Sequence, residues 1–199
     1  MPLPPVDTPV QPRTVADLSR EIAAGHTFEY LFFWGHRPGP GGTVGPGCLS
    51  QWWPAVFTVD GASFGTAEHY MMWAKALLFG DTDTAGRILA APTPADAKAL
   101  GRTAHGFDQD VWNAHRYDIV VAGSLAKFGQ HPDLREFLLG TGDRILVEAS
   151  PRDRIWGIGM GANNPKAGHP DTWRGQNLLG FALTDTRTAL RQAHSPAVA

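Results

Sequence analysis

The sequence predicts an α+β fold in which a single, predominantly helical domain forms around a small antiparallel sheet. Its 199 residues can bury one sizeable core but are few for two full domains. Several segments carry helix end signals, and the few strand-like runs do not alternate with them as βαβ units would. One such run, at 56–64, surrounds Asp60 and Gly61, a pair typical of the turn that joins antiparallel strands.

The first elements follow from their end signals. Residues 1–13 are rich in proline and lack periodicity, so we expect a disordered arm there. Thr14 has the character of a helix cap, and it predicts a short helix through Ala23. The aromatic run at 28–34 predicts a strand, and the glycine- and proline-rich stretch at 36–47 predicts a loop.

Helices dominate the rest of the chain. Thr66 caps the first of them, and Gly129 is expected to end the longest. The remaining expected elements are helices at 81–91, 93–102, 109–128 and 131–139, a strand at 144–150, and a last helix that Asn177 opens. We expect one domain over 14–193, followed by a flexible tail at 194–199.

Composition excludes several classes of protein. The 17 basic and 19 acidic residues give a net charge of −2, which is not the broad positive surface of a dedicated duplex-DNA binder. A single cysteine, Cys48, permits no internal disulfide, and the eight histidines form no HxxxH or HxH pair, so we expect neither a metal nor another cofactor. Without a secretory signal or a spanning segment, the expected location is the cytoplasm.

The stretch GTAEHYMMWAKALLFGD, at 65–81, combines a helix that is apolar nearly all round with two charges, Glu68 and Lys75. These two residues are seven apart, so they project from the same face but lie too far apart for the usual close pair. Each therefore needs its own partner, in another segment or in a ligand. The alternative is that Glu68 only faces the helix dipole and Lys75 reaches solvent.

Two later motifs have the same ambiguity. In VEASPRDRIWGIG, at 147–159, Glu148 lies on a strand, Asp153 lies in the turn after it and Trp156 precedes two glycines, an arrangement suited to a sugar phosphate. The alternative is a turn in which Asp153 caps local amides while Trp156 packs under the sheet. In GQNLLG, at 175–180, capping of the last helix would by itself account for Asn177.

Four segments share their order and spacing with one known family. They are LSQWWPAVFTVDGASFGTAEHYMMWAKA (49–76), SLAKFGQHPDLREFLLGTGDRILVEAS (124–150), DRIWGIG (153–159) and WRGQNLLGFAL (173–183). In these motifs the chain resembles the YbiA-like, or NADAR, family of N-glycosidases, which is associated with NAD and ADP-ribose. The resemblance extends from Phe32 to Arg191.

The resemblance implies a hydrolase that cuts the bond between ribose C1 and a base nitrogen. Two activities are known in the family: release of the pyrimidine from phosphoribosylamino-pyrimidine intermediates of riboflavin synthesis, and removal of ADP-ribose from guanine. The implied catalytic residues are Glu68, Lys75 and Asp153. The implied substrate-binding residues are Ser50, Gln51, Tyr70, Trp112, Trp156, Gly157, Asn177 and Gly180. Many members have Ser-Asn-Phe where this chain has Ser50-Gln51-Trp52, which leaves the released base open.

The same resemblance suggests roles and partners. Glu68 would stabilise the oxocarbenium-like state and activate water, while Lys75 would either attack C1 as a neutral amine or hold an acidic group of the ligand. Backbone amides around Gly157 and Gly159 could hold phosphate. The expected partner is a small ribosyl phosphate or ADP-ribose, with ADP-ribosylated nucleic acid as a further candidate and no membrane. A non-catalytic module that binds ADP-ribose or NAD, and a structural domain, are the competing interpretations.

Overall fold

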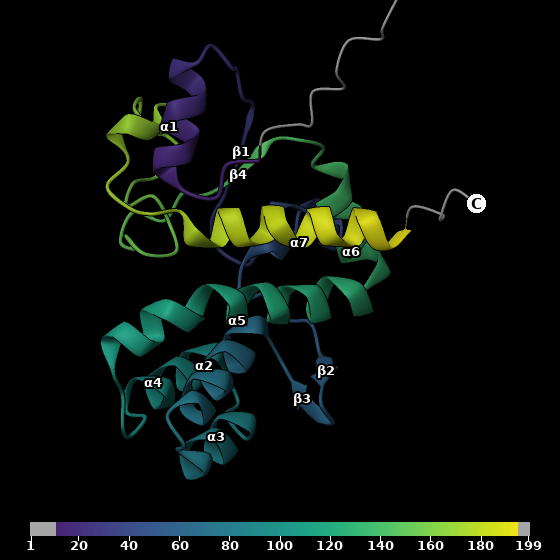
Figure 1. Ribbon diagram of the computed structural model, residues 1–199. Coiled ribbons are helices and arrows are strands. Elements are labelled where there is room, and N and C mark those ends of the chain that lie inside the picture. Colours follow the sequence, from purple (N-terminus) through teal and green to yellow (C-terminus); the bar gives the residue numbers. More distant parts are fainter. Residues whose placement is uncertain (1–10, 195–199) are drawn as a thin grey trace, which may run out of the picture.

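The computed structural model describes residues 11–194, and within them a long central helix separates two groups of elements (Figure 1). This central helix is α5 (Gln109–Gln130). On one side lie α2 (Ala67–Leu78), α3 (Thr82–Leu89), α4 (Pro94–Arg102) and the hairpin strands β2 (Phe57–Val59) and β3 (Ala62–Phe64). On the other side lie α1 (Val15–Ala23), β1 (Tyr30–Phe33), β4 (Ile145–Glu148) and α7 (Leu178–His194). The helix α6 (Pro132–Gly140) connects α5 to β4. This set of helices and short strands confirms the α+β class and the predominantly helical character.

The helices begin at the residues that the sequence indicates. The main difference from expectation is the residue at which α5 ends. The side chains of Thr14, Thr66 and Thr93 each accept a hydrogen bond from a backbone N–H in the first turn of the helix that follows. Gly129, however, does not end α5, which continues to Gln130. The helix stops there because the residue before a proline is displaced from the helical conformation, and residue 131 is extended ahead of the proline that opens α6.

The expectation of an antiparallel sheet is right for the hairpin and wrong for the strands that carry the site. β2 and β3 pair antiparallel, whereas β1 and β4 pair parallel, from Tyr30 beside Ile145 to Phe33 beside Glu148. Five helices, α2 to α6, separate β1 from β4 in the chain, and long crossovers of this kind join parallel strands. Because both strands end at the same edge, Phe33 and Glu148 lie side by side there.

The helix α7 covers β4 at very short range. Gly180 has no room for a side chain, because a Cβ atom there would overlap the carbonyl oxygen of Leu146. Just before the helix, the Asn177 side chain donates to the Leu146 carbonyl at 2.9 Å and accepts from the Glu148 N–H at 3.0 Å. The side chain of Asn177 therefore takes the place of a third strand along the open edge of β4.

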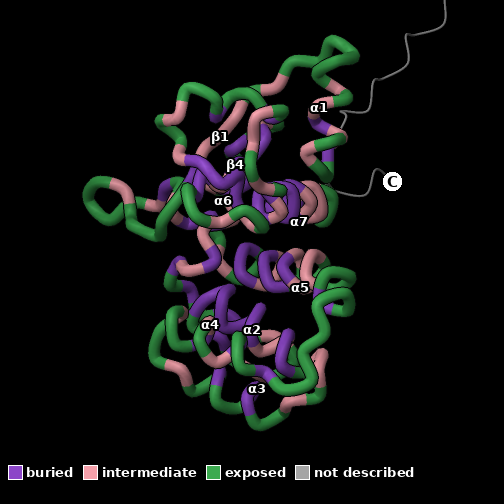
Figure 2. Tube along the Cα trace, turned by 90° about the vertical axis from the view of Figure 1, so that its left-hand side faces the viewer, coloured by how far each residue is buried: buried purple, intermediate pink, exposed green. Residues whose placement is uncertain are grey.

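The buried residues gather where these layers face one another (Figure 2). One large cluster joins α2, α5, α7 and β4, and it includes Met71, Phe128, Leu146 and Leu183. A second cluster lies between α1 and the β1–β4 pair, and a third lies between the hairpin and α2. No helix of the described residues is long and apolar enough to cross a membrane.

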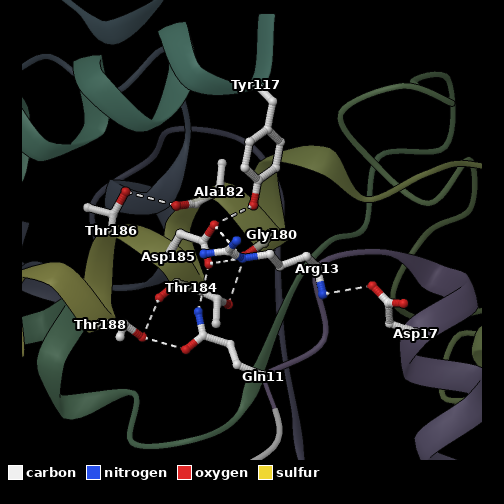
Figure 3. Close-up of polar contacts among 10 residues, drawn as sticks. All are labelled: Gln11, Arg13, Asp17, Tyr117, Gly180, Ala182, Thr184, Asp185, Thr186 and Thr188. Carbon is white, nitrogen blue, oxygen red and sulfur yellow. Dashed lines mark hydrogen bonds and ion pairs between the residues drawn. The ribbon is translucent and has the colours of Figure 1, made fainter. Parts of the chain in front are cut away.

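The segment just before α1 is attached to α7 (Figure 3). Gln11 donates to Asp185 at 2.7 Å and accepts from the Thr188 hydroxyl at 2.7 Å, and Arg13 lies 3.2 Å from the same aspartate. The Tyr117 hydroxyl on α5 also donates to Asp185, at 3.0 Å. The expected arm therefore does not extend to residue 13, because residues 11–13 are held by polar contacts. Residues 1–10 and 195–199 lie outside the described part, and position 194 belongs to α7 rather than to the tail.

Candidate active site

Glu68 lies in the first turn of α2 and is almost completely enclosed, with 2% of its surface exposed. Its backbone N–H donates to the carbonyl of Gln51 at 3.0 Å, which joins the start of the helix to the segment before the hairpin. The positive end of the helix dipole favours a carboxylate at this position. The expectation of a buried charge on this helix is therefore confirmed for Glu68.

The surroundings of the Glu68 carboxyl have opposing effects on its pKa. Burial raises its pKa, while the ammonium of Lys98, 3.7 Å from Oε1, and a hydrogen bond from the Trp52 side chain lower it. The negative charge of Asp153 raises it further. Oε1 is closed off from solvent and forms no hydrogen bond within the protein, although the Lys98 ammonium lies 3.7 Å from it.

The helix α4 supplies the partners of both charges on α2. Gly101 allows this approach, because a Cβ atom there would overlap the side chain of Met72. Lys98, one turn earlier on α4, reaches Glu68, and the Gly101 carbonyl accepts a hydrogen bond from Lys75 at 2.9 Å. Each charge thus has its own partner, as the seven-residue spacing predicts.

Lys75 occupies an aromatic environment. Its Nζ lies 4.2 Å from the centre of the Phe107 ring and 5.6 Å from that of Trp112, which is consistent with cation–π contacts. Burial and the nearby positive charge of Arg102 lower the pKa of Lys75. Lys75 is only 9% exposed and its Nζ donates to the Gly101 carbonyl, so the alternative in which it reaches solvent does not describe it.

A second carboxyl enters the site from the last residue of β4. Oε2 of Glu148 is buried and has no hydrogen-bond partner. Burial, together with the charges of Asp153 and Glu68, raises the pKa of Glu148 to about 8, and Lys98 opposes this rise. These shared effects bring Glu148, Glu68, Asp153 and Lys98 into one electrostatic cluster.

Asp153 follows β4 in a tight turn. One carboxylate oxygen accepts from the backbone N–H groups of Ile155 and Trp156, both at 2.8 Å, and the Gly159 N–H donates to the Asp153 carbonyl at 2.9 Å. Trp156 is half-buried and packs against the main core. The capping alternative therefore describes the hydrogen bonds of Asp153, while its charge acts on the two glutamates.

An aromatic side chain, Trp52, forms the wall beside Glu68. Its ring centre lies 5.9 Å from that of His36 and 5.9 Å from the Lys98 ammonium, and its backbone N–H donates to the Ser50 hydroxyl at 3.1 Å. Lys127 of α5 fixes this segment by donating to the carbonyls of Cys48 and Ser50, at 2.6 and 2.9 Å.

Comparison with known proteins identifies the family. Residues 32–191 match the family model described as the NADAR domain. The chain belongs to the NADAR family. A NADAR relative named as an N-glycosidase, from Acanthamoeba polyphaga mimivirus, is 40% identical over 171 residues, which cover 83% of this chain and 99% of the relative.

Further relatives agree with this assignment. The N-glycosidase YbiA of Escherichia coli is 32% identical over 69% of this chain and 76% of its own length. A protein of Vibrio vulnificus named as a riboflavin biosynthesis protein is 32% identical over 75% of this chain but only 37% of its own length. The solved structure of Escherichia coli YbiA matches with a TM-score of 0.64 at 24% identity, over 87% of this chain and 94% of that one, and at this identity the likeness concerns the fold alone.

Three residues expected to bind substrate in this NADAR domain instead support its framework. Tyr70 packs among Phe57, Phe64 and Trp73 in the third core cluster rather than facing the site. Asn177 is fully buried, with both ends of its amide bonded to β4, and Gly180 permits the close helix contact. The family spacing reflects packing at these positions, which the sequence motif alone does not distinguish from binding.

The glycines after β4 also differ from expectation. A Cβ atom on Gly157 would lie 2.7 Å from the Glu148 carbonyl oxygen, so this glycine is needed for packing against β4. The N–H groups of Ile158 and Gly159 donate to the carbonyls of Glu148 and Asp153, so neither is available to a phosphate. The expected amide site for phosphate is therefore not formed by these two groups.

The structure adds residues that the motifs did not assign to the NADAR site. Lys98 lies in an ordinary amphipathic helix with no local signal, and only its contact with α2 reveals it. In the sequence, Trp52 appeared only as a difference from the Ser-Asn-Phe of many family members. In the structure its side chain forms a hydrogen bond with Glu68. Glu148 did have a signal, since a carboxylate that ends a strand beside the DRIWGIG turn is unusual on a buried strand.

Proposed function

We propose that this NADAR protein is an N-glycosidase that hydrolyses the bond between ribose C1 and a base nitrogen. The names of the relatives support the coarse activity, hydrolysis of an N-glycosidic bond. We propose two substrate classes, a phosphoribosylamino-pyrimidine and ADP-ribosylated guanine. The observation that carries the proposal is the buried Glu68 carboxyl, whose Oε1 forms no hydrogen bond within the protein and lies 3.7 Å from the Lys98 ammonium, in one electrostatic cluster with a second glutamate.

The chemistry of the bond explains why such a carboxyl is needed. As the bond between C1 and the base nitrogen breaks, positive charge develops on the ribose ring, and a fixed carboxylate near C1 stabilises that state more than the ground state. Glu68 supplies this charge and accepts a proton from the water that adds to C1. Lys98 and Trp52 favour the ionised form that both tasks require.

Lys75 has one of two roles in this proposal. Its lowered pKa and its contact with a carbonyl rather than a carboxylate are compatible with a neutral amine that attacks C1. In its charged form the same group would hold an acidic part of the ligand between Phe107 and Trp112. Borohydride reduction during turnover would trap a covalent adduct at Lys75 only in the first case.

Product analysis by mass spectrometry tests the proposal. Wild type and Glu68→Gln are incubated in parallel with a phosphoribosylamino-pyrimidine and with an ADP-ribosylated guanine oligonucleotide. Wild type should release ribose 5-phosphate from the first or ADP-ribose from the second, and Glu68→Gln should lose about 10²-fold or more of that rate. Glu136→Gln, the same change on the exposed face of α6, is the matched control and should keep full activity.

Two results would contradict the proposal. Turnover by Glu68→Gln near the wild-type rate would remove the assigned role of Glu68. Tight binding of ADP-ribose by wild type without cleavage of either substrate would instead favour the non-catalytic module, which needs the aromatic side chains but not the carboxylate.

A further inference from the structure

The carboxyl groups of Glu148 and Glu68 differ in the hydrogen-bond donors around them. This difference assigns Glu148 a separate role. We propose that Glu148 donates the proton that the departing base takes up when its bond to ribose C1 breaks. This inference rests on the N-glycosidase activity proposed above.

The backbone of Glu148 is fixed on both sides. Its N–H donates to the Asn177 side chain at 3.0 Å, and its carbonyl accepts from Ile158 at 2.9 Å. Phe33 of β1 lies beside it in the parallel register. A residue held in this way at the end of a strand presents its side chain in a reproducible position, as a catalytic group requires.

The charges around Glu148 do not permit every carboxyl to be ionised. Three carboxyls, those of Glu68, Glu148 and Asp153, interact with one another, and Lys98 is the positive charge that acts on the two glutamates. Three negative charges close together in a buried site with one positive charge are strongly unfavourable, so one carboxyl retains its proton.

The hydrogen bonds indicate which carboxyl that is. Two backbone N–H groups donate to Asp153. Burial raises the pKa of Glu68 as well, and its Oε1 has no hydrogen-bond partner, but Lys98 and a hydrogen bond from the Trp52 side chain oppose this effect and favour its ionised form. Oε2 of Glu148 has no donor at all and is closed off from water. A carboxyl without donors is favoured in its neutral form, which agrees with a pKa raised to about 8.

The proposed step balances in atoms and charge. The electron pair of the C1–N bond moves to the base nitrogen, which takes the proton of Glu148, and Glu148 becomes a carboxylate. Water then adds to C1 and gives its proton to Glu68. Glu68 then releases one proton and Glu148 takes up one, so the enzyme returns to its starting state and the net change is addition of water to the N-glycosidic bond.

A pair of substrates with different leaving groups tests this role. One is whichever natural-type substrate wild type cuts, and the other is p-nitrophenyl riboside 5-phosphate, whose leaving group departs without a proton. Glu148→Gln should lose about 10²- to 10⁴-fold in kcat on the first substrate and much less on the second, because general acid catalysis contributes that much. Glu148→Asp should retain part of the rate, and Glu136→Gln all of it.

The pH profile gives a second readout that a structural role would not change. Wild type should lose kcat/KM as pH rises through about 8, where Glu148 loses its proton. Glu148→Gln should lack this basic limb. Equal losses on both substrates, or a basic limb that persists in Glu148→Gln, would overturn the proposal.

A direct titration separates this inference from the proposed activity. Carbon-13 NMR of glutamate carboxyl groups should show a resonance that titrates near pH 8 in wild type and is absent in Glu148→Gln. If that resonance is present but wild type cuts no N-glycoside, the proposed function fails while the protonated carboxyl stands. If Glu148 titrates at an ordinary glutamate pKa, the proton-donor role fails whatever the activity.

Discussion

Glu68 and Lys98 illustrate how one contact adjusts a buried charge. Alone, the carboxyl would be kept neutral by its burial, and the ammonium 3.7 Å away opposes that effect. The Lys98 side chain is 36% exposed, so water and salt weaken its influence. The pair is therefore better understood as setting the ionisation of Glu68 than as stabilising the fold.

Replacement of Lys98 by methionine should displace the pH profile of activity upward. Without the ammonium the pKa values of Glu68 and Glu148 both rise, so the acidic and basic limbs of kcat/KM should each move to higher pH. Lys98→Arg keeps the charge and should leave the limbs in place. A profile that stays unchanged in Lys98→Met would show that Lys98 does not set either ionisation.

At the residue scale, the sequence predicts the buried charges on α2 but not their partners. An apolar helix with two isolated charges is visible in the printed sequence, and both Glu68 and Lys75 are buried as that pattern indicates. Lys98 comes from a helix thirty positions downstream, and no local pattern distinguishes it from a solvent-exposed lysine. Tyr70 shows the opposite problem, because a position that matches the family motif turns out to be part of the core.

At the element scale, α5 holds the segment before the hairpin through one buried lysine. Lys127 is 1% exposed and donates to the carbonyls of Cys48 and Ser50, which precede Trp52 in the site wall. Burial lowers the pKa of Lys127 from 10.5 to about 7, and the nearby Cys48 group opposes this. The position of Trp52 therefore depends on the amine of Lys127, which loses its charge near neutral pH.

The lowered pKa of Lys127 predicts a stability that rises with pH. Between about pH 7 and 10.5 the unfolded chain binds a proton at this lysine that the folded chain does not, so unfolding becomes less favourable as pH rises. Relative to Lys127→Met, the free energy of unfolding of wild type should increase by up to about 1.4 kcal/mol per pH unit in this window. Urea denaturation at pH 7.5 and 9.5 measures the difference.

The control for this prediction is an exposed lysine. Lys166 is exposed in the loop after β4. Lys166→Met should leave the pH dependence of the free energy of unfolding unchanged. If the difference between wild type and Lys127→Met is the same at both pH values, Lys127 keeps its charge when buried and the two carbonyls stabilise it more than burial destabilises it.

The elements themselves were predictable from the sequence, but their pairing was not. Threonine and aspartate caps locate the starts of the helices, because they satisfy backbone N–H groups through purely local contacts. The direction of β1 relative to β4 depends on how α2 to α6 pack between them, and that is a property of the whole core. The parallel edge that carries Glu148 could therefore not be inferred from either strand alone.

At the scale of the whole molecule, the site joins two groups of elements on either side of α5 (Figure 1). Glu68 and Lys98 come from α2 and α4, whereas Glu148 and Asp153 come from β4 and the loop after it. The segment at residues 11–13 is attached away from these residues, to Asp185 and Thr188 on α7. The stability that the contacts between residues 11–13 and α7 provide should therefore be separable from the chemistry of the site.

A double variant tests this separation. Gln11→Ala with Arg13→Ala removes the contacts to α7, and since a hydrogen bond contributes about 1 kcal/mol, Tm should fall by about 2–8 °C. The kcat should stay within about twofold of wild type. Arg20→Ala, which removes only an exposed pair with Asp17, should leave Tm nearly unchanged. A loss of activity larger than the loss of stability explains would contradict the separation.

The pairing of Tyr30 with Ile145 also has a consequence for biosynthesis. As the nascent chain leaves the ribosome, the helices α2 to α5 can pack on one another, but β1 has no partner until β4 emerges, and the open edge of β4 stays uncovered until Asn177 follows. Glu68 and Lys98 would thus be in place long before Glu148. A ribosome-bound chain that stops just short of Asn177 would hold a folded helical half and the acidic groups, but Glu148 would lie on a strand whose edge is uncovered, so competence for chemistry would arrive only after Asn177 has emerged.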